Sequence, residues 1–200
     1  MNVPDCLDRA RIVFVDCEYT GEHAATTLVS VGLVTLTGNE LYLTLNDYDR
    51  SQVTDWLRLN VLFEIDEAQS VSSADAFEQI KKFLDDYTGT QPLYVVSAGL
   101  TQDVILLLEL FKYGRKSGTF FHALHDTPNY LQHFAFIDLN TLFRSAGVAP
   151  MSTRENFVGL ENQVRRHNAL DDARVVRACF LKLMATPVGE ILARTLEHAA

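Results

Sequence analysis

The feature that most constrains this chain is an apolar segment that ends in two acids. Residues 12–15 are Ile, Val, Phe and Val, and Asp16, Cys17 and Glu18 follow directly. Such a run predicts a buried strand, on which Asp16 and Glu18 share one face while Cys17 points to the other. Two carboxylates on one face repel each other unless a cation joins them, so the pair indicates a divalent metal site. The alternative is a strand end whose acids face water.

A second motif lies near the other end of the chain, where residues 167–173 are His-Asn-Ala-Leu-Asp-Asp-Ala. His167 and Asp172 are five residues apart and cannot share a helix face at ~100° per residue. We therefore predict that His167 lies in the loop before a helix capped by Asn168. Asp172 lines up with Val176, Cys179 and Leu183 and is predicted to point inward, whereas Asp171 lines up with Arg174, Ala178 and Lys182 and is predicted to be solvated. Taken alone, His167 also fits a surface-loop histidine.

Asp103 is a third candidate acid. Thr101 can cap a helix after a predicted strand at 92–97, and Asp103 would then share an inward face with Leu106, Leu107 and Leu110. An inward aspartate needs a partner. The alternative is an acid that only interacts favourably with the helix dipole.

The order of predicted elements indicates an α/β fold. We expect strands at 12–16, 27–36, 40–45, 92–97 and 134–138, and helices at 52–63, 73–87, 101–113, 139–146 and 169–186, with a tail helix from Pro187 to about 198. The first three strands form an antiparallel meander, and the order then alternates. This predicts a mixed five-stranded sheet with helices on both faces, which suits the ribonuclease H-like architecture. Residues 114–132 are expected to form a mobile loop.

Length and composition predict one domain over residues 1–200, because 200 residues with 48% hydrophobic and 22% charged side chains are ordinary for one globular core. No apolar run is long enough to span a bilayer and the first residues do not resemble a signal peptide, so we expect a cytoplasmic protein without membrane contact. Cys6, Cys17 and Cys179 have no Cys-x-x-Cys spacing and are expected to be reduced.

Together, Asp16, Glu18, Asp103, His167 and Asp172 resemble, in this order, the motifs of the DEDDh superfamily of 3′-to-5′ exonucleases. The similar segments are 16–21, 97–103 with Leu107, and 167–172, so the resemblance covers nearly the whole chain. Residues 16–21 and the Gln102-Asp103 pair are similar to the small exoribonucleases of the RNase T and oligoribonuclease type. Residues 22–26 lack the segment that oligoribonuclease carries there, and residues 56–62 resemble a less studied exoribonuclease-like branch.

The resemblance implies phosphodiester hydrolysis with two Mg²⁺ or Mn²⁺ ions per site. By this resemblance, Asp16 would contact both ions, Glu18 and Asp172 would hold the ion that activates water, and Asp103 would support the second ion. His167 would accept the proton of that water. The products would be nucleoside 5′-monophosphates, and a homodimer is expected.

Substrate contacts are predicted at Tyr19 and Thr20, where Tyr19 either stacks on the terminal base or packs beneath the next loop. Lys112, Arg115 and Lys116 either contact phosphates or form a solvated charge run. The formal charge of −9 argues against coating of long nucleic acid and favours a short or single-stranded substrate, with RNA preferred to DNA. The alternatives are a DNA-directed, proofreading-type exonuclease and a non-catalytic nucleic-acid-binding module.

Overall fold

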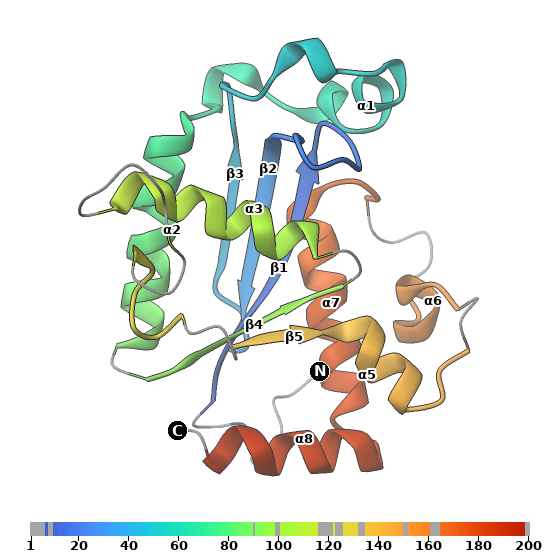
Figure 1. The fold of residues 1–200 in the computed structure, drawn as a ribbon. Coiled ribbons are helices and arrows are strands. Elements are labelled where there is room, and N and C mark those ends of the chain that lie inside the picture. Colours follow the sequence, from blue (N-terminus) through green and yellow to red (C-terminus); the bar gives the residue numbers. More distant parts are fainter. Residues whose placement is uncertain are drawn as a thin grey trace.

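The computed structural model describes residues 7, 10–89, 91–98, 101–115, 122, 126–131, 135–149, 152–160 and 165–198, with side chains to residue 196. Five strands form one mixed sheet in the order β3-β2-β1-β4-β5 (Figure 1). Antiparallel pairing joins β1 to β2 and β2 to β3, whereas β4 and β5 run parallel to β1. The strands are β1 (Arg11–Tyr19), β2 (Leu28–Thr35), β3 (Glu40–Thr44), β4 (Leu93–Ser97) and β5 (Phe136–Asp138). The predicted α/β, ribonuclease H-like fold class is confirmed.

Helices cover both faces of the sheet (Figure 1). One core cluster joins α2 (Ser73–Thr88) and α3 (Gln102–Leu110) to the face that carries Val13 and Val15. The other cluster joins the opposite face to α5 (Leu139–Ser145), α7 (Ala169–Leu183) and α8 (Pro187–His198). Since β1 is buried from both sides, its apolar run predicts the central strand correctly.

Gly32 lets α7 approach the sheet. A Cβ atom at this position would lie 2.2 Å from the carbonyl oxygen of Ala169, the first residue of α7. Gly32 is also the register partner of Asp16 across β1 and β2. Because Gly32 has no side chain, the N-terminal turn of α7 can lie close to the strand that carries the paired acids.

The predicted helix at 52–63 is wrong as one element. Residues 50–69 instead form α1 (Asp55–Asn60) and separate 3-10 helices at Arg50–Gln52, Leu62–Glu64 and Glu67–Gln69. Thr54 caps α1, but Leu57 is the helix's one buried residue, and it packs in a small core cluster with Val29, Tyr48 and Val61. A segment with so little buried area has no long apolar stripe to continue a helix.

Two other differences concern shorter stretches. The helix predicted at 101–113 ends at Leu110 and tightens into a 3-10 turn over Phe111–Gly114, where Gly114 packs against the ring of Phe77. A five-residue helix, α6 (Arg154–Val158), was not predicted because one and a half turns give no readable period. The predicted loop at 114–132 lies mostly outside the described residues, as do Cys6 and Lys116. Within the described part of the chain, no helix is both long and apolar enough to cross a membrane.

Candidate active site

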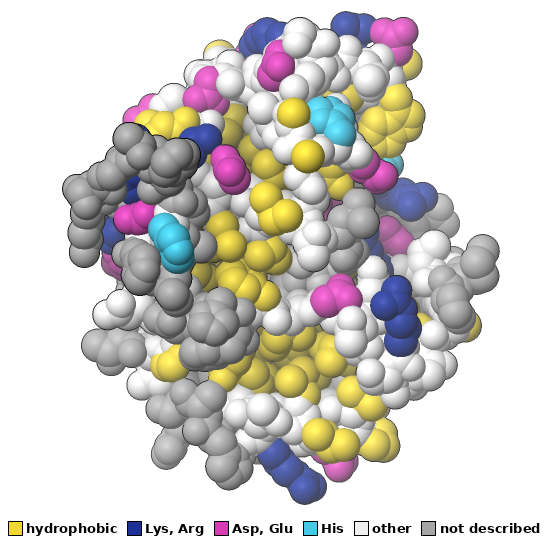
Figure 2. All heavy atoms as spheres, viewed as in Figure 1, with side chains coloured by type: hydrophobic (Ala, Val, Ile, Leu, Met, Phe, Trp, Pro, Cys, Tyr) yellow, Lys and Arg dark blue, Asp and Glu magenta, His cyan; other side chains and the backbone are white. Residues whose placement is uncertain are grey.

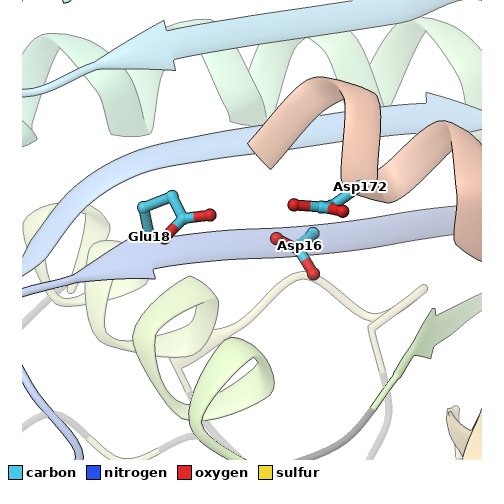
Figure 3. Close-up of side chains that lie close together, drawn as sticks. All are labelled: Asp16, Glu18 and Asp172. Atoms are coloured by element: carbon cyan, nitrogen blue, oxygen red, sulfur yellow. The ribbon is translucent and has the colours of Figure 1, made fainter. Parts of the chain in front are cut away.

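Three carboxylates converge where the end of β1 meets the start of α7. Asp16 and Glu18 lie two residues apart on β1, and Asp172 reaches them from the first turns of α7 (Figure 3). One carboxylate oxygen from each residue lies within 4.8 Å of the others. Asp16 and Asp172 are buried, and Glu18 is half-buried. The structure therefore brings together three of the four predicted acidic ligands.

Asp103 lies beside this cluster rather than in it. It is buried in the first turn of α3, and its Oδ1 accepts a hydrogen bond from the backbone N–H of Cys17 at 3.3 Å. That bond fixes Asp103 next to the strand residue that separates Asp16 from Glu18. All four acids line the same pocket.

Burial of the carboxylates is the largest effect on the electrostatics of the pocket. Burial, followed by repulsion from Asp172 and Asp103, raises the pKa of Glu18 to about 8. Burial also raises the pKa of Asp103 to about 7, although the Cys17 hydrogen bond opposes the shift. The pKa values of Asp16 and Asp172 are raised by burial too. Carboxylate oxygens are the ligands that Mg²⁺ and Mn²⁺ prefer, so this donor set fits a divalent metal.

His167 lies in the loop before α7, as predicted. Its backbone has φ 64°, and its N–H donates to Asp172 Oδ2 at 3.0 Å. Asn168 caps α7 by accepting from the N–H of Asp171. The imidazole lies edge-on to the ring of Trp56, with centroids 4.9 Å apart, and lines the acid pocket.

The pocket has a volume of about 570 Å³. Besides the residues already described, its walls include Tyr19 and Thr20 and two side chains that the sequence reasoning missed, Trp56 and Arg154. Trp56 belongs to the segment first predicted as one long helix, and Arg154 to the short α6. The sequence around Trp56 or Arg154 does not predict a place in the site, because both residues reach the acids only through the tertiary fold.

Comparisons with known proteins give information on the fold of the chain. No sequence-family model matches the chain, and neither does any characterised protein in a sequence comparison. Among solved structures, Pop2p of S. pombe in its Mg²⁺- and Mn²⁺-bound form superposes with a TM-score of 0.60 at 12% identity, covering 90% of this chain and 84% of Pop2p. The chain shares its fold with Pop2p and with exonuclease I.

Two further structures agree. E. coli exonuclease I in complex with a dA13 oligonucleotide gives a TM-score of 0.60 at 10% identity, and cell-death related nuclease 4 gives 0.56 at 13%. The matches cover 92% and 87% of this chain but only 42% of exonuclease I and 63% of the second nuclease. This chain is thus similar to less than two thirds of each of these two nucleases.

Asp171 is not a solvated neighbour, contrary to the prediction. It is buried, and its two carboxylate oxygens pair with Arg174 at 2.5 Å and Arg165 at 3.2 Å. Arg174 also pairs with Glu40 on the edge strand β3. Arg165 and Arg174 cover Asp171, whereas Arg174 and Lys182 on the same helix face are exposed as predicted. Sequence periodicity cannot distinguish a buried ion pair from a charged surface.

The two predicted substrate residues differ in their surroundings. The Thr20 hydroxyl is buried and bonded to Thr26, Thr27 and the side chain of Gln52, so it holds the loop after β1 and has little left to offer a ligand. Tyr19 is half-buried and packs partly into the core, with its pKa raised to about 12 by burial.

Lys112, from the predicted basic cluster, does not line the acid pocket. Lys112 pairs with Glu109 at 3.3 Å and lines a separate, smaller pocket of about 150 Å³. On the face drawn in Figure 2, the Lys and Arg side chains of the described residues are scattered rather than gathered in one stripe.

Proposed function

We propose that this chain is a metal-dependent 3′-to-5′ exonuclease that hydrolyses short or single-stranded nucleic acid to nucleoside 5′-monophosphates. The observation that carries the proposal is the cluster of Asp16, Glu18 and Asp172, with Asp103 and His167 in the same pocket. Further support comes from the fold. It is shared with Pop2p in its Mg²⁺- and Mn²⁺-bound form and with exonuclease I in complex with an oligonucleotide.

The acids would hold the metal ions, two per site, by the roles that the sequence resemblance implies. Asp16, Glu18 and Asp172 offer oxygens close enough for one shared ion, and Asp103, bonded to the backbone of Cys17, would support a second. Such ions polarise the phosphate and lower the pKa of the attacking water.

The chain's other residues supply proton transfer and positioning. His167 would accept a proton from the attacking water, because its imidazole lies in the wall of the acid pocket. Trp56 is 53% exposed beside His167 and offers a flat face on which a terminal base can stack. Tyr19, which directly follows Glu18, is a second aromatic in the pocket wall.

RNA is the favoured substrate through the resemblance of residues 16–21 to oligoribonuclease. DNA is the second candidate, because E. coli exonuclease I shares the fold and is seen with a DNA oligonucleotide. The choice depends on contacts to the 2′-hydroxyl. The test is a time course on 5′-labelled RNA and DNA oligomers of several lengths, with Mg²⁺, Mn²⁺ or EDTA.

We expect products that shorten by one nucleotide at a time from the 3′ end, and no reaction in EDTA. Full activity in EDTA would contradict the metal-dependent mechanism. Rapid cutting of a circular single strand would instead show an endonuclease, and binding without cleavage would favour the non-catalytic module.

Three expectations from the sequence stay predictions: a single domain over residues 1–200, a cytoplasmic location and a homodimer. For the dimer, α8 after Pro187 is one candidate contact. Light scattering at high protein concentration should give twice the monomer mass, and a monomer would contradict the prediction.

A further inference from the structure

Arg154 brings a positive charge into the acid pocket. Among the described residues that line the pocket, Arg154 is the one Lys or Arg. Its Nη1 lies 3.9 Å from Asp16 Oδ1 and donates to the carbonyl oxygen of Ala98, just after β4, at 3.4 Å. Its own carbonyl oxygen accepts from the thiol of Cys179 on α7 at 3.4 Å. The backbone of Arg154 is thus bonded to α7, and its guanidinium to the residue after β4, at the edge of the acid cluster.

The pairing of Arg154 with Asp16 is loose. A separation of 3.9 Å is too long for a hydrogen bond, and the arginine side chain is 30% exposed. A guanidinium has five N–H donors, and within the described part of the chain one bond, to Ala98, is made by this group. Donors therefore remain for an anion in the pocket.

Arg154 acts on all four acids. It lowers the pKa of Asp16, Glu18, Asp103 and Asp172, against the upward effect of burial on each. A bound divalent cation would stabilise the ionised acids in place of Arg154, because it carries more charge and binds the oxygens directly. The same cation would repel the guanidinium from Asp16.

We propose that Arg154 binds a non-bridging phosphate oxygen of the nucleic acid when the acids hold metal, and pairs with Asp16 when they do not. The inference rests on the proposed function. A pocket walled by carboxylates repels a phosphodiester except where a cation faces it, and the planar guanidinium matches the spacing of phosphate oxygens. Arg154 would thus position the substrate and compete with the metal for Asp16.

The test compares Arg154→Gln, Arg154→Lys and the wild type, with Arg144→Gln as a matched control. Arg144 is an exposed residue in the last turn of α5, so its loss removes the same charge away from the pocket. Two quantities are measured on the full chain: binding of a fluorescein-labelled single-stranded pentanucleotide in Ca²⁺ by anisotropy, and binding of Mg²⁺ alone by calorimetry.

We expect Arg154→Gln to weaken pentanucleotide binding about 10- to 100-fold, as for the loss of a charged hydrogen bond, and to tighten Mg²⁺ binding. The affinities of Arg154→Lys should lie between those of the wild type and Arg154→Gln, because lysine keeps the charge but lacks the planar guanidinium that can bind two oxygens at once. Arg144→Gln should match the wild type in both measurements.

Equal pentanucleotide binding by Arg154→Gln and Arg144→Gln would overturn the inference. Weaker Mg²⁺ binding together with a lower melting temperature in Arg154→Gln would also overturn it, since these two results would mean that Arg154 only stabilises the fold of the site. If the wild type binds the pentanucleotide through Arg154 but cleaves no nucleic acid, the proposed function fails and the inference stands. If the wild type cleaves and Arg154→Gln behaves as the control, only the inference fails.

Discussion

His167 reaches the pocket through a backbone conformation that few residues adopt. Its φ of 64° is left-handed, which costs a non-glycine residue about 1 kcal/mol, and the hydrogen bond from its N–H to Asp172 offsets that cost. Because this bond uses the backbone, removal of the imidazole leaves it in place. The imidazole is therefore not needed to hold Asp172, the proposed metal ligand, which is bonded to the main chain of His167.

His167→Ala should therefore slow hydrolysis by ~10²-fold or more and leave Mg²⁺ affinity nearly unchanged. Single-turnover kinetics and calorimetry measure the two effects. His167→Asn is the control, because asparagine tolerates a positive φ but is no base at neutral pH, so it should be as slow as His167→Ala. Loss of metal binding in both variants would show that the imidazole is a ligand instead.

The adjacent aspartates should give different defects. Asp172→Asn removes a ligand from the three-acid cluster and should abolish nearly all turnover and weaken Mg²⁺ binding. Asp171→Asn loses its pairs with Arg165 and Arg174 and should lower the free energy of unfolding by about 1–2 kcal/mol, since both arginines are largely exposed and water screens them. Its turnover should stay near that of the wild type.

Urea unfolding and steady-state kinetics on both variants check this contrast. An inactive Asp171→Asn beside an active Asp172→Asn would mean that the register of α7 is wrong.

At the scale of elements, the approach of α7 to β2 decides whether the acids meet. Gly32→Ala would put a Cβ 2.2 Å from the Ala169 carbonyl, so α7 must shift away from the sheet. We expect a lower melting temperature and weaker Mg²⁺ binding, because the shift carries Asp172 away from Asp16. Thermal unfolding and calorimetry measure both.

Gly38→Ala separates that effect from a general loss of stability. Gly38 lies between β2 and β3 with φ 97° and open space around it, so its substitution strains the turn without touching α7. It should lower the melting temperature and leave Mg²⁺ affinity unchanged. If both glycine variants bind metal like the wild type, the position of α7 does not depend on Gly32.

At the scale of the whole molecule, the buried acids make metal-free stability depend on pH. Glu18 and Asp103 have ordinary pKa values of 4.5 and 3.8, raised in the folded chain to about 8 and about 7. Between these limits the folded protein binds more protons than the unfolded one, so its free energy of unfolding falls as pH rises from about 4.5 to 8. Mg²⁺ favours the ionised acids and should remove most of this fall.

Urea unfolding at pH 5.5 and pH 8, with Mg²⁺ or EDTA, measures the effect. Glu18→Gln should show a smaller decrease in EDTA than the wild type, because one titrating group is gone. Metal-free stability that rises over this interval would contradict the prediction.

Local patterns were sufficient for the parts of this protein that depend on neighbours in sequence. The apolar run before Asp16 predicts a central strand, Asn168 predicts the start of α7, and five-residue spacing places His167 outside that helix. Each rests on backbone periodicity or capping, which act over a few residues. The order of strands and helices likewise follows from short-range signals.

Only the tertiary structure decided which side chains share the pocket. Arg154 and Trp56 come from short helices with weak periodicity, and Asp171 is covered by arginines from its own helix and the loop before it. Asp103 reaches Cys17 through a hydrogen bond between positions 86 residues apart. Contacts of this kind depend on how helices and strands pack in the folded chain, and a local sequence pattern does not predict them.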